Sequence, residues 1–403
     1  MAEYGQLPGQ QFYLELTIKG VRYNPLNIQY LVIKSWIFNI LPYIEIMFAD
    51  NGFLMESFPL EDGEDIQITL GKHEDDENPL NLTFSLNDYS IAIAGDNRRS
   101  FVTLNGFLKA TDMFMLRTRR FPKQNSSLVF STIASESEIE FSNPFNIVPS
   151  DNMTWIQNSQ SNFDFIRHVL RRAYVPDDML MFYATTSNKF EINSLRSSIE
   201  RKDTKKAKFS IENYEKNVKD EDDKDDTIWF ASYSTVNNSG HFNKKLTYGF
   251  QYNYWDLEQA VTKTYNQIPK MTALSFRNKD VIKENKIVQE RKSMDYIEPN
   301  LYGEQYFESP LRNQFLKNNF FANSLVLNIN ALSQVSLMDK IYVEIPSMQA
   351  ENESNETMSG FYLVAGVQHE VSNGGIYKKK VALGRNGMEK SPDVKMEYGV
   401  ETL

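Results

Sequence analysis

At 403 residues the chain is longer than one hydrophobic core normally supports, so two or three domains are expected. The absence of cysteine excludes disulfides, thiolate metal sites and thiol nucleophiles. The formal net charge of −10 argues against a nucleic-acid-binding surface, and the sequence predicts neither a signal peptide nor insertion into a membrane.

The first third of the chain predicts short strands, because β-branched and aromatic residues alternate with polar ones and turn residues recur at short intervals. The candidate strands are residues 12–18, 28–37, 43–48, 65–70, 80–86, 90–94 and 101–109. Three dipeptides suit turns or bulges: Asn51-Gly52, Asp62-Gly63 and Asn105-Gly106. Residues 1–118 are therefore expected to form a small β-barrel, which resolves its open edges by closure or by pairing with a partner.

An α/β middle domain is expected over residues 119–226. An amphipathic helix is predicted from apolar residues at three- and four-residue intervals: Phe163, Ile166, Val169 and Leu170. Ser161 or Asn162 is the expected cap, and Pro176 is expected to stop the helix. Residues 179–184 and 189–193 follow as a predicted strand pair.

A highly charged stretch, residues 200–226, closes the middle domain and predicts a solvated loop. Strands are expected again at residues 227–235 and 245–253, which would begin a second barrel within residues 227–254. Residues 255–318 would be an insert or the remainder of the middle domain. Two helical patterns are predicted there, at residues 255–265 and 309–319, with Ser309 as a cap and Pro310 at the first helical position.

The final segment, residues 319–403, is expected to complete the second barrel and to carry the C-terminal tail. Its candidate strands are residues 324–329, 340–345, 360–368 and 377–383. The predicted fold class is thus mainly β with an α/β middle domain, in which two small β-barrels are related by internal pseudo-symmetry.

No pattern in the sequence identifies a catalytic, cofactor-binding or metal-binding residue, and a non-enzymatic protein is expected. There is no Gly-x-Ser-x-Gly elbow, and His369-Glu370 lacks the second histidine of a zinc-binding helix. The acidic run at residues 220–226 lacks the central glycine and terminal glutamate of a calcium loop. The carboxylates of residues 61–65 are interpreted as turn and cap residues, and His369 as a residue at the end of a strand.

Four segments resemble the baseplate hub proteins of contractile-tailed bacteriophages, a family that shares its domains with type VI secretion spike proteins. The clearest is a closing hairpin, GFYLVAGVQHE at residues 360–370 with GIYKKKVALGR at 375–385, in which a strand ends at a histidine and returns toward Leu-x-Arg. Residues 337–346, LMDKIYVEIP, resemble the preceding hub strand, although Met338-Asp339 stands where a Gly-rich turn is usual. Residues 155–166 resemble the helix start of the hub's middle domain, and residues 58–68 resemble a strand of its first barrel.

The resemblance implies a structural subunit of the tail baseplate in the virion, assembled in the host cytoplasm. It implies a homotrimer whose two barrels per subunit make a pseudo-sixfold ring, joining a threefold central spike protein to the sixfold tail tube protein. Contacts with the tape-measure protein and other baseplate components are implied as well.

Two alternatives of other classes stay open. One is a β-rich cell-wall-degrading enzyme, which would need carboxylates of shifted pKa in a concave pocket. The other is a carbohydrate-binding tail protein, for which the 21 Tyr and 4 Trp could supply stacking surfaces.

Overall fold

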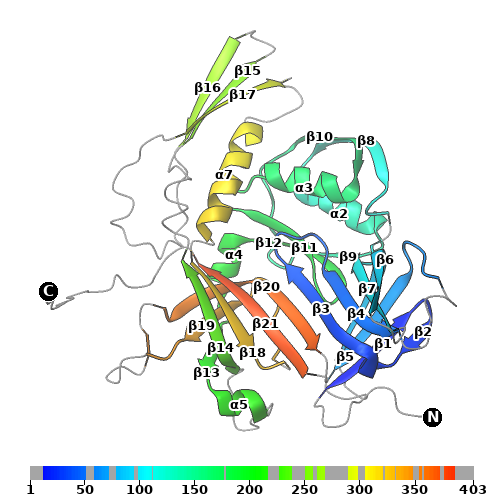
Figure 1. The fold of residues 1–403 in the computed structure, drawn as a ribbon. Coiled ribbons are helices and arrows are strands. Elements are labelled where there is room, and N and C mark those ends of the chain that lie inside the picture. Colours follow the sequence, from blue (N-terminus) through cyan, green and yellow to red (C-terminus); the bar gives the residue numbers. More distant parts are fainter. Residues whose placement is uncertain are drawn as a thin grey trace, which may run out of the picture.

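The structure is a computed structural model that describes residues 12–50, 59–71, 79–94, 99–110, 112–176, 178–216, 227–237, 250–256, 261–267, 289–297, 305–320, 323–331, 333–347, 354–355, 358–372 and 376–385. Two β-barrels lie next to each other, and a region of helices and short strands lies beside them (Figure 1). No helix among these residues is both long and apolar enough to cross a lipid bilayer.

The first barrel curves around one core with the strand order β3-β4-β7-β6-β5-β1. Its strands are β1 (Tyr13–Ile18), β3 (Ile28–Trp36), β4 (Tyr43–Asp50), β5 (Asp65–Gly71), β6 (Leu80–Ala94) and β7 (Arg99–Leu108). A short strand β2 (Val21–Tyr23) folds back on β1, and the 3-10 helix η1 (Pro25–Asn27) leads into β3. The strands predicted at 80–86 and 90–94 are one strand, because a β-bulge between Leu86 and Asp88 interrupts the alternation without ending the ladder.

The second barrel is closed, with the strand order β19-β13-β14-β18-β21-β20 and a further ladder between β20 and β19. Its strands are β13 (Lys205–Phe209), β14 (Thr227–Asn237), β18 (Asn323–Ile329), β19 (Lys340–Glu344), β20 (Gly360–Ser372) and β21 (Ile376–Arg385). Its core is built from inward-facing residues that are almost fully buried: Ala207, Phe230, Leu327, Ile341, Val343 and Val364.

The two barrels repeat one topology, which confirms the predicted internal pseudo-symmetry. Strands β3 to β7 of the first barrel correspond in order and in neighbours to β14, β18, β19, β20 and β21 of the second. The sixth position differs, because β1 runs antiparallel to β5 whereas β13 runs parallel to β19. The repeat therefore covers five strands, with the sixth supplied by a different segment in each barrel.

Strand β20 belongs to both barrels. Its first residues pair with β19, and beyond a bulge between Val364 and Gly366 its outer edge pairs antiparallel with β3 of the first barrel. This β20–β3 seam contains seven residue pairs, from Gly366 opposite Trp36 to Ser372 opposite Tyr30. One continuous sheet of 13 strands results.

The middle region packs helices against two small sheets. Strand β8 (Leu116–Gln124) pairs with β10 (Met153–Ser161), and β12 (Lys189–Ser194) pairs with β11 (Leu180–Ala184) and with β9 (Glu140–Ser142). The helices are α2 (Ser126–Glu136), α3 (Asn162–Arg172) and α4 (Leu195–Glu200). Helix α3 confirms the prediction with Ser161 as its cap, whose Oγ accepts the N–H of Asp164 at 3.1 Å. The helix ends at Arg172, before Pro176 is reached.

Two expectations about loops and helices are wrong. Within the stretch predicted as a solvated loop, residues 205–209 are barrel strand β13 and residues 211–216 are helix α5 (Ile211–Lys216), while residues 217–226 lie outside the described residues. The helix predicted at residues 255–265 is wrong as well, because β16 (Val261–Gln267) forms a sheet with β15 (Phe250–Asp256) and β17 (Gln289–Ile297). β-Branched residues at 261, 262 and 264 favour the extended form.

Helix α7 (Gln305–Phe320) confirms the second predicted helix but not its start. It begins four residues before Ser309, so Pro310 lies inside the helix and Ser309 is not the cap. Asn313 of this helix donates to the carbonyl of Ala173 at 2.8 Å, which holds α7 against the end of α3.

Candidate assembly surface

Each barrel has a tight turn in front of an equivalent strand, β5 or β19. Gly63 and Met338 occupy the same place in the two turns, with φ of +86° and +64°. The N–H of Gly63 donates to the carbonyl of Leu86 at 2.9 Å, and that of Met338 to the carbonyl of Val364 at 2.8 Å. Met338 thus holds a left-handed conformation that costs a residue with a side chain about 1 kcal/mol. Its side chain is fully buried, which offsets this cost.

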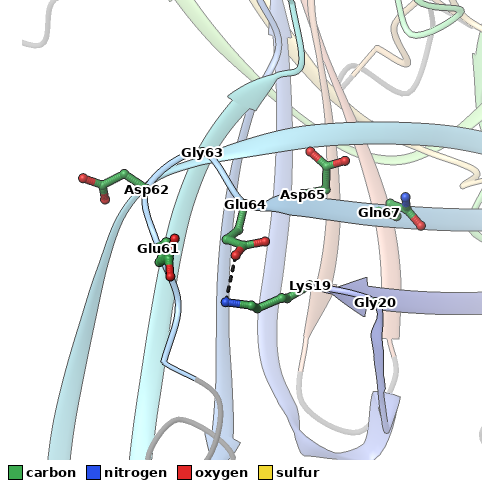
Figure 2. Close-up of a pocket in the computed structure, with 8 residues that line it drawn as sticks. All are labelled: Lys19, Gly20, Glu61, Asp62, Gly63, Glu64, Asp65 and Gln67. Carbon is green, nitrogen blue, oxygen red and sulfur yellow. Dashed lines mark ion pairs between the residues drawn. The ribbon is translucent and has the colours of Figure 1, made fainter.

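The residue that follows in each turn is a carboxylate paired with lysine. Lys19 Nζ lies 2.9 Å from Glu64 Oε1, and Figure 2 shows the two side chains pointing toward each other. In the second barrel Lys205 Nζ lies 2.8 Å from Asp339 Oδ2, and Arg201 lies 3.2 Å from Asp339 Oδ1. The side chain of Asp339 is 10% exposed, against 23% for Glu64, so the second turn is the more buried version.

The turn of the first barrel borders a surface hollow of about 400 Å³. Its lining includes the residues predicted to be turn and cap residues, Glu61, Asp62, Glu64 and Asp65, and Lys19 neutralises part of their charge (Figure 2). Across the described parts of the chain, no group of three or more His, Asp or Glu side chains is placed to hold a metal ion. The N–H of Glu64 donates to the carbonyl of Glu61 at 3.2 Å, which places these carboxylates in and beside a tight turn.

His369 does not end a strand, contrary to the expectation, because β20 continues to Ser372. Its side chain is buried, and Nδ1 lies 2.7 Å from the hydroxyl of Tyr377 on β21. Burial, with Lys379 nearby, lowers the pKa of His369 well below its usual value. Burial also lowers the pKa of Lys379 to about 8, although its Nζ donates to the carbonyl of Ser333 at 2.7 Å. These groups form the interior of the hairpin rather than an open site.

The β20–β3 seam begins with a close approach between Gly366 and Trp36. A Cβ atom at position 366 would lie 2.1 Å from Cε3 and 2.5 Å from Cζ3 of the indole ring. Only glycine leaves room for that ring. Glycine is needed here because it has no side chain, and not because the backbone has a positive φ. Sequence reasoning missed this contact, although a glycine inside a predicted strand is the signal of such an approach.

The equivalent hairpin of the first barrel presents an open edge. Strand β5 pairs with β6 only as far as Ser85, and from Asp88 to Ala94 the ladder of β6 is with β7 alone in the described part of the chain. Three apolar side chains on one face of this segment are exposed: Tyr89 by 39%, Ile91 by 49% and Ile93 by 77%. A bare, apolar strand edge is a typical site of pairing with another chain.

Three carboxyl groups of the middle region have a pKa raised by burial, which is the property that an enzyme would use: Asp151, Asp178 and Glu191. Asp151 accepts the backbone N–H groups of Ser126 at 2.8 Å and Tyr174 at 3.0 Å. Asp178 accepts those of Met179 and Arg196. Glu191 accepts the hydroxyl of Tyr183 at 3.3 Å. Their oxygens hold the local backbone and side chains in place, so these groups give no support to the enzyme alternative.

Among the described residues, His168 and the paired arginines of the basic strand β8 also belong to packed structure. His168 of α3 stacks on Phe165, and burial, with Arg172 and Arg171, lowers its pKa to about 4. His73 and His241 lie outside the described residues. On β8, Arg119 pairs with Glu136 and donates to Gln157 at 2.7 Å, whereas Arg117 pairs with Asp112 at 2.6 Å.

The sequence matches no protein-family model and no curated protein. The fold does match solved structures. A tail protein from Neisseria meningitidis MC58 aligns over 94% of this chain and 98% of its own, with a TM-score of 0.59 and 8% identity. The 43 kDa tail protein of prophage MuSo2 from Shewanella oneidensis aligns over 94% and 99%, with a TM-score of 0.57 and 9% identity.

A third match is the E. coli c3393 protein, described as a component of the type VI secretion system with structural similarity to the T4 bacteriophage tail proteins gp27 and gp5. It aligns over 92% of this chain and 76% of its own, with a TM-score of 0.50 and 10% identity. This chain therefore has the fold of these tail and type VI secretion proteins, and the resemblance seen in the sequence motifs is confirmed at the level of the fold.

Proposed function

We propose that this chain, which has the hub-type fold of phage tail proteins, is a structural, non-enzymatic subunit of a tail baseplate. In this proposal three copies form a ring of six barrels, which adapts a threefold central spike protein to a sixfold tail tube protein. The tape-measure protein and other baseplate components are the further proposed partners. The virion baseplate is the proposed location, with assembly in the host cytoplasm.

One observation carries the proposal: two barrels of the same topology lie side by side in one chain, joined edge to edge by the β20–β3 seam. Repeated modules joined head to tail in this way generate a ring when the rotation closes. Three copies of a duplicated module give six near-equivalent positions, whereas the rest of each subunit repeats three times. The likeness to tail proteins over 94% of the chain supports the same reading.

The domain division expected from the sequence is kept as part of the proposal, with two changes. The first barrel would span residues 1–118, and the second would combine residues 227–237 with 319–403. Strand β13 (Lys205–Phe209) is assigned to the second barrel, whereas β15 (Phe250–Asp256), expected there within residues 227–254, belongs to a separate three-stranded sheet. Limited proteolysis followed by mass spectrometry tests this division. Cleavage confined to the boundaries is expected, and early cuts inside β3 or β20 would contradict it.

The experiment for the ring is native mass spectrometry of the purified full chain, combined with electron microscopy of the particles. The expected result is a trimer with six density lobes around a central opening. A stable monomer at micromolar concentration, both alone and with the spike protein, would overturn the ring. Release of soluble fragments from purified cell wall by the trimer would overturn the non-enzymatic part.

A further inference from the structure

The two hairpins that follow the bulges can be aligned residue by residue. The bulge between Leu86 and Asp88 corresponds to the bulge between Val364 and Gly366. Counting from these bulges, the positions of the first-barrel hairpin match those of the second as follows: Tyr89 with Val367, Ile91 with His369, and Ile93 with Val371.

The matched positions differ sharply in burial. Val367, His369 and Val371 are 4%, 6% and 3% exposed, because β20 is docked on β3 of the same chain. Their counterparts in β6 are 39%, 49% and 77% exposed. The first-barrel hairpin therefore exposes the surface that, in the second-barrel hairpin, is covered by docking on β3. Among the described residues no strand docks on this surface of β6.

The receiving strands can be aligned in the same way. Strand β3 has a bulge between Ile28 and Tyr30, and β14 has one between Phe230 and Ser232. The count places Leu31 with Tyr233 and Ile33 with Thr235. Both β3 residues are fully buried, whereas Thr235 is exposed and Tyr233 is half-buried. Beyond Phe230 the ladder of β14 is with β18 alone in the part of the chain that the structure describes.

Both open edges also lack the charges that normally protect exposed strands. Neither segment, residues 89–94 (YSIAIA) nor residues 232–237 (SYSTVN), contains Asp, Glu, Lys or Arg, although 24% of the residues of the chain are charged. Edge strands of monomeric proteins are usually guarded by charge, proline or a further bulge. Two uncharged edges at equivalent places in the repeat are therefore each suited to a partner strand.

We propose that these two edges pair with each other between copies: β6 of one copy docks antiparallel on β14 of the next. The register follows from the β20–β3 seam by substitution of matched residues, and it runs from Tyr89 opposite Asn237 to Ala94 opposite Ser232. The central pair, Ile91 opposite Thr235, takes the place of His369 opposite Ile33. This inference rests on the proposed ring and specifies the contact that closes it.

The donor and acceptor edges lie on different barrels, so the contact is head to tail. Each copy gives one edge and receives another, and the chain of contacts ends only when the ring closes. Within a ring, intrachain β20–β3 seams would alternate with interchain β6–β14 seams. All six barrels would then be joined by the same kind of strand pairing.

Cysteine cross-linking tests the register directly, because the natural chain has no cysteine to interfere. Directly opposed residues of antiparallel strands have Cα atoms about 4.5–5.5 Å apart, within the range that a disulfide spans. The double variants Ile91→Cys/Thr235→Cys and Ser90→Cys/Val236→Cys are expected to form interchain disulfides under mild oxidation. Lys34→Cys/Gln368→Cys is the intrachain counterpart of the second pair and serves as the positive control.

The matched negative control is Ile91→Cys/Val236→Cys, in which a shift of one residue turns one thiol to the opposite face of the sheet. It should give at most a tenth of the interchain product. Folding of every variant is checked by circular dichroism. A further variant, Ile91→Lys/Ile93→Lys, is expected to dissociate the oligomer, whereas Val148→Lys, at a site 72% exposed, should leave it intact.

The outcomes separate this inference from the proposed function. A trimer in which neither in-register pair cross-links, or in which Ile91→Cys alone links two copies through β6, overturns the β6–β14 contact but leaves the ring. In-register cross-links in an assembly that does not contain three copies support the contact and overturn the trimer. A folded monomer with no interchain disulfide, both alone and with the spike protein, overturns both.

Discussion

Gly366 lies against the indole ring of Trp36 at the point where the two barrels join. The glycine stands just after the bulge at which one edge of β20 changes its partner from β19 to β3, and the tryptophan is the last residue of β3. Packing of the ring on bare backbone fixes the start of the β20–β3 seam, and therefore its register.

Gly366→Ala is expected to lower the free energy of unfolding by about 1–3 kcal/mol, because the added methyl group overlaps the ring and forces Trp36 or the strand to move. Urea denaturation measures this change. Trp36→Leu should reduce the cost of Gly366→Ala when the two are combined. Strictly additive effects of the two substitutions would show that the contact does not set the cost.

The paired turns offer a matched comparison. Asp339→Ala should destabilise the protein by about 2–3 kcal/mol, because this nearly buried carboxylate pairs with Lys205 and Arg201 and accepts the N–H of Ser336 at 2.9 Å. Glu64→Ala should cost less than about 1 kcal/mol, because its single pair with Lys19 is closer to solvent. Chemical denaturation measures the loss of unfolding free energy for each variant. Equal losses would show that the difference in burial does not set the cost.

The lowered pKa of Lys379 predicts that the free energy of unfolding rises with pH in the alkaline range. Its pKa of about 8 in the folded protein lies below the ordinary value of 10.5, so the unfolded chain binds more protons between these values and unfolding becomes harder as pH rises. The gain is about 2 kcal/mol between pH 8 and pH 10. Lys379→Met should remove this slope, and Lys378→Met, at an exposed neighbour, should keep it. A slope that survives Lys379→Met would show that another group titrates.

Acid should lower the stability through two histidines, the buried His369 and the half-buried His168. The pKa of His168 is lowered to about 4, and that of His369 is also lowered, so their contribution to stability is full above pH 6.5 and falls as pH drops from there toward their folded values. His168→Phe keeps an aromatic ring beside Phe165 and removes one titrating group. Its stability should therefore depend less on pH between 6.5 and 4.5 in urea titrations. If the stability of His168→Phe depends on pH as strongly as that of the natural chain, groups other than His168 cause the acid sensitivity.

Most barrel strands could be predicted because their pattern is local. In β4, for example, Ile44, Ile46 and Phe48 alternate with more exposed residues, and this alternation is visible in the sequence. Strand β13 could not be found in the same way. Its sequence is KKAKF, and only Ala207 is buried. Because three of its five residues are lysines, the sequence predicts a charged loop where the structure has a barrel strand.

The candidate assembly surface depends on pairings between distant segments, which a local pattern does not encode. The sequence predicts His369 at a strand end, whereas β20 pairs on both edges as far as Ser372, with β21 and with β3. The pairing with β3, more than 300 positions earlier, leaves no local signal in the sequence. Likewise, the exposure of Ile91 is informative only beside the burial of His369. The repeat itself could be predicted, whereas the inequality between its two halves needed the structure.

The β20–β3 seam also has a mechanical consequence. Because its seven residue pairs are carried by a strand that is at the same time part of the closed second barrel, one barrel cannot slide along the other unless these backbone hydrogen bonds break together. A pull directed along β20 loads the pairs in parallel, whereas a pull across the strands would open them one after another. The chain is therefore stiffest against shear between its barrels, the direction in which a force along β20 would act.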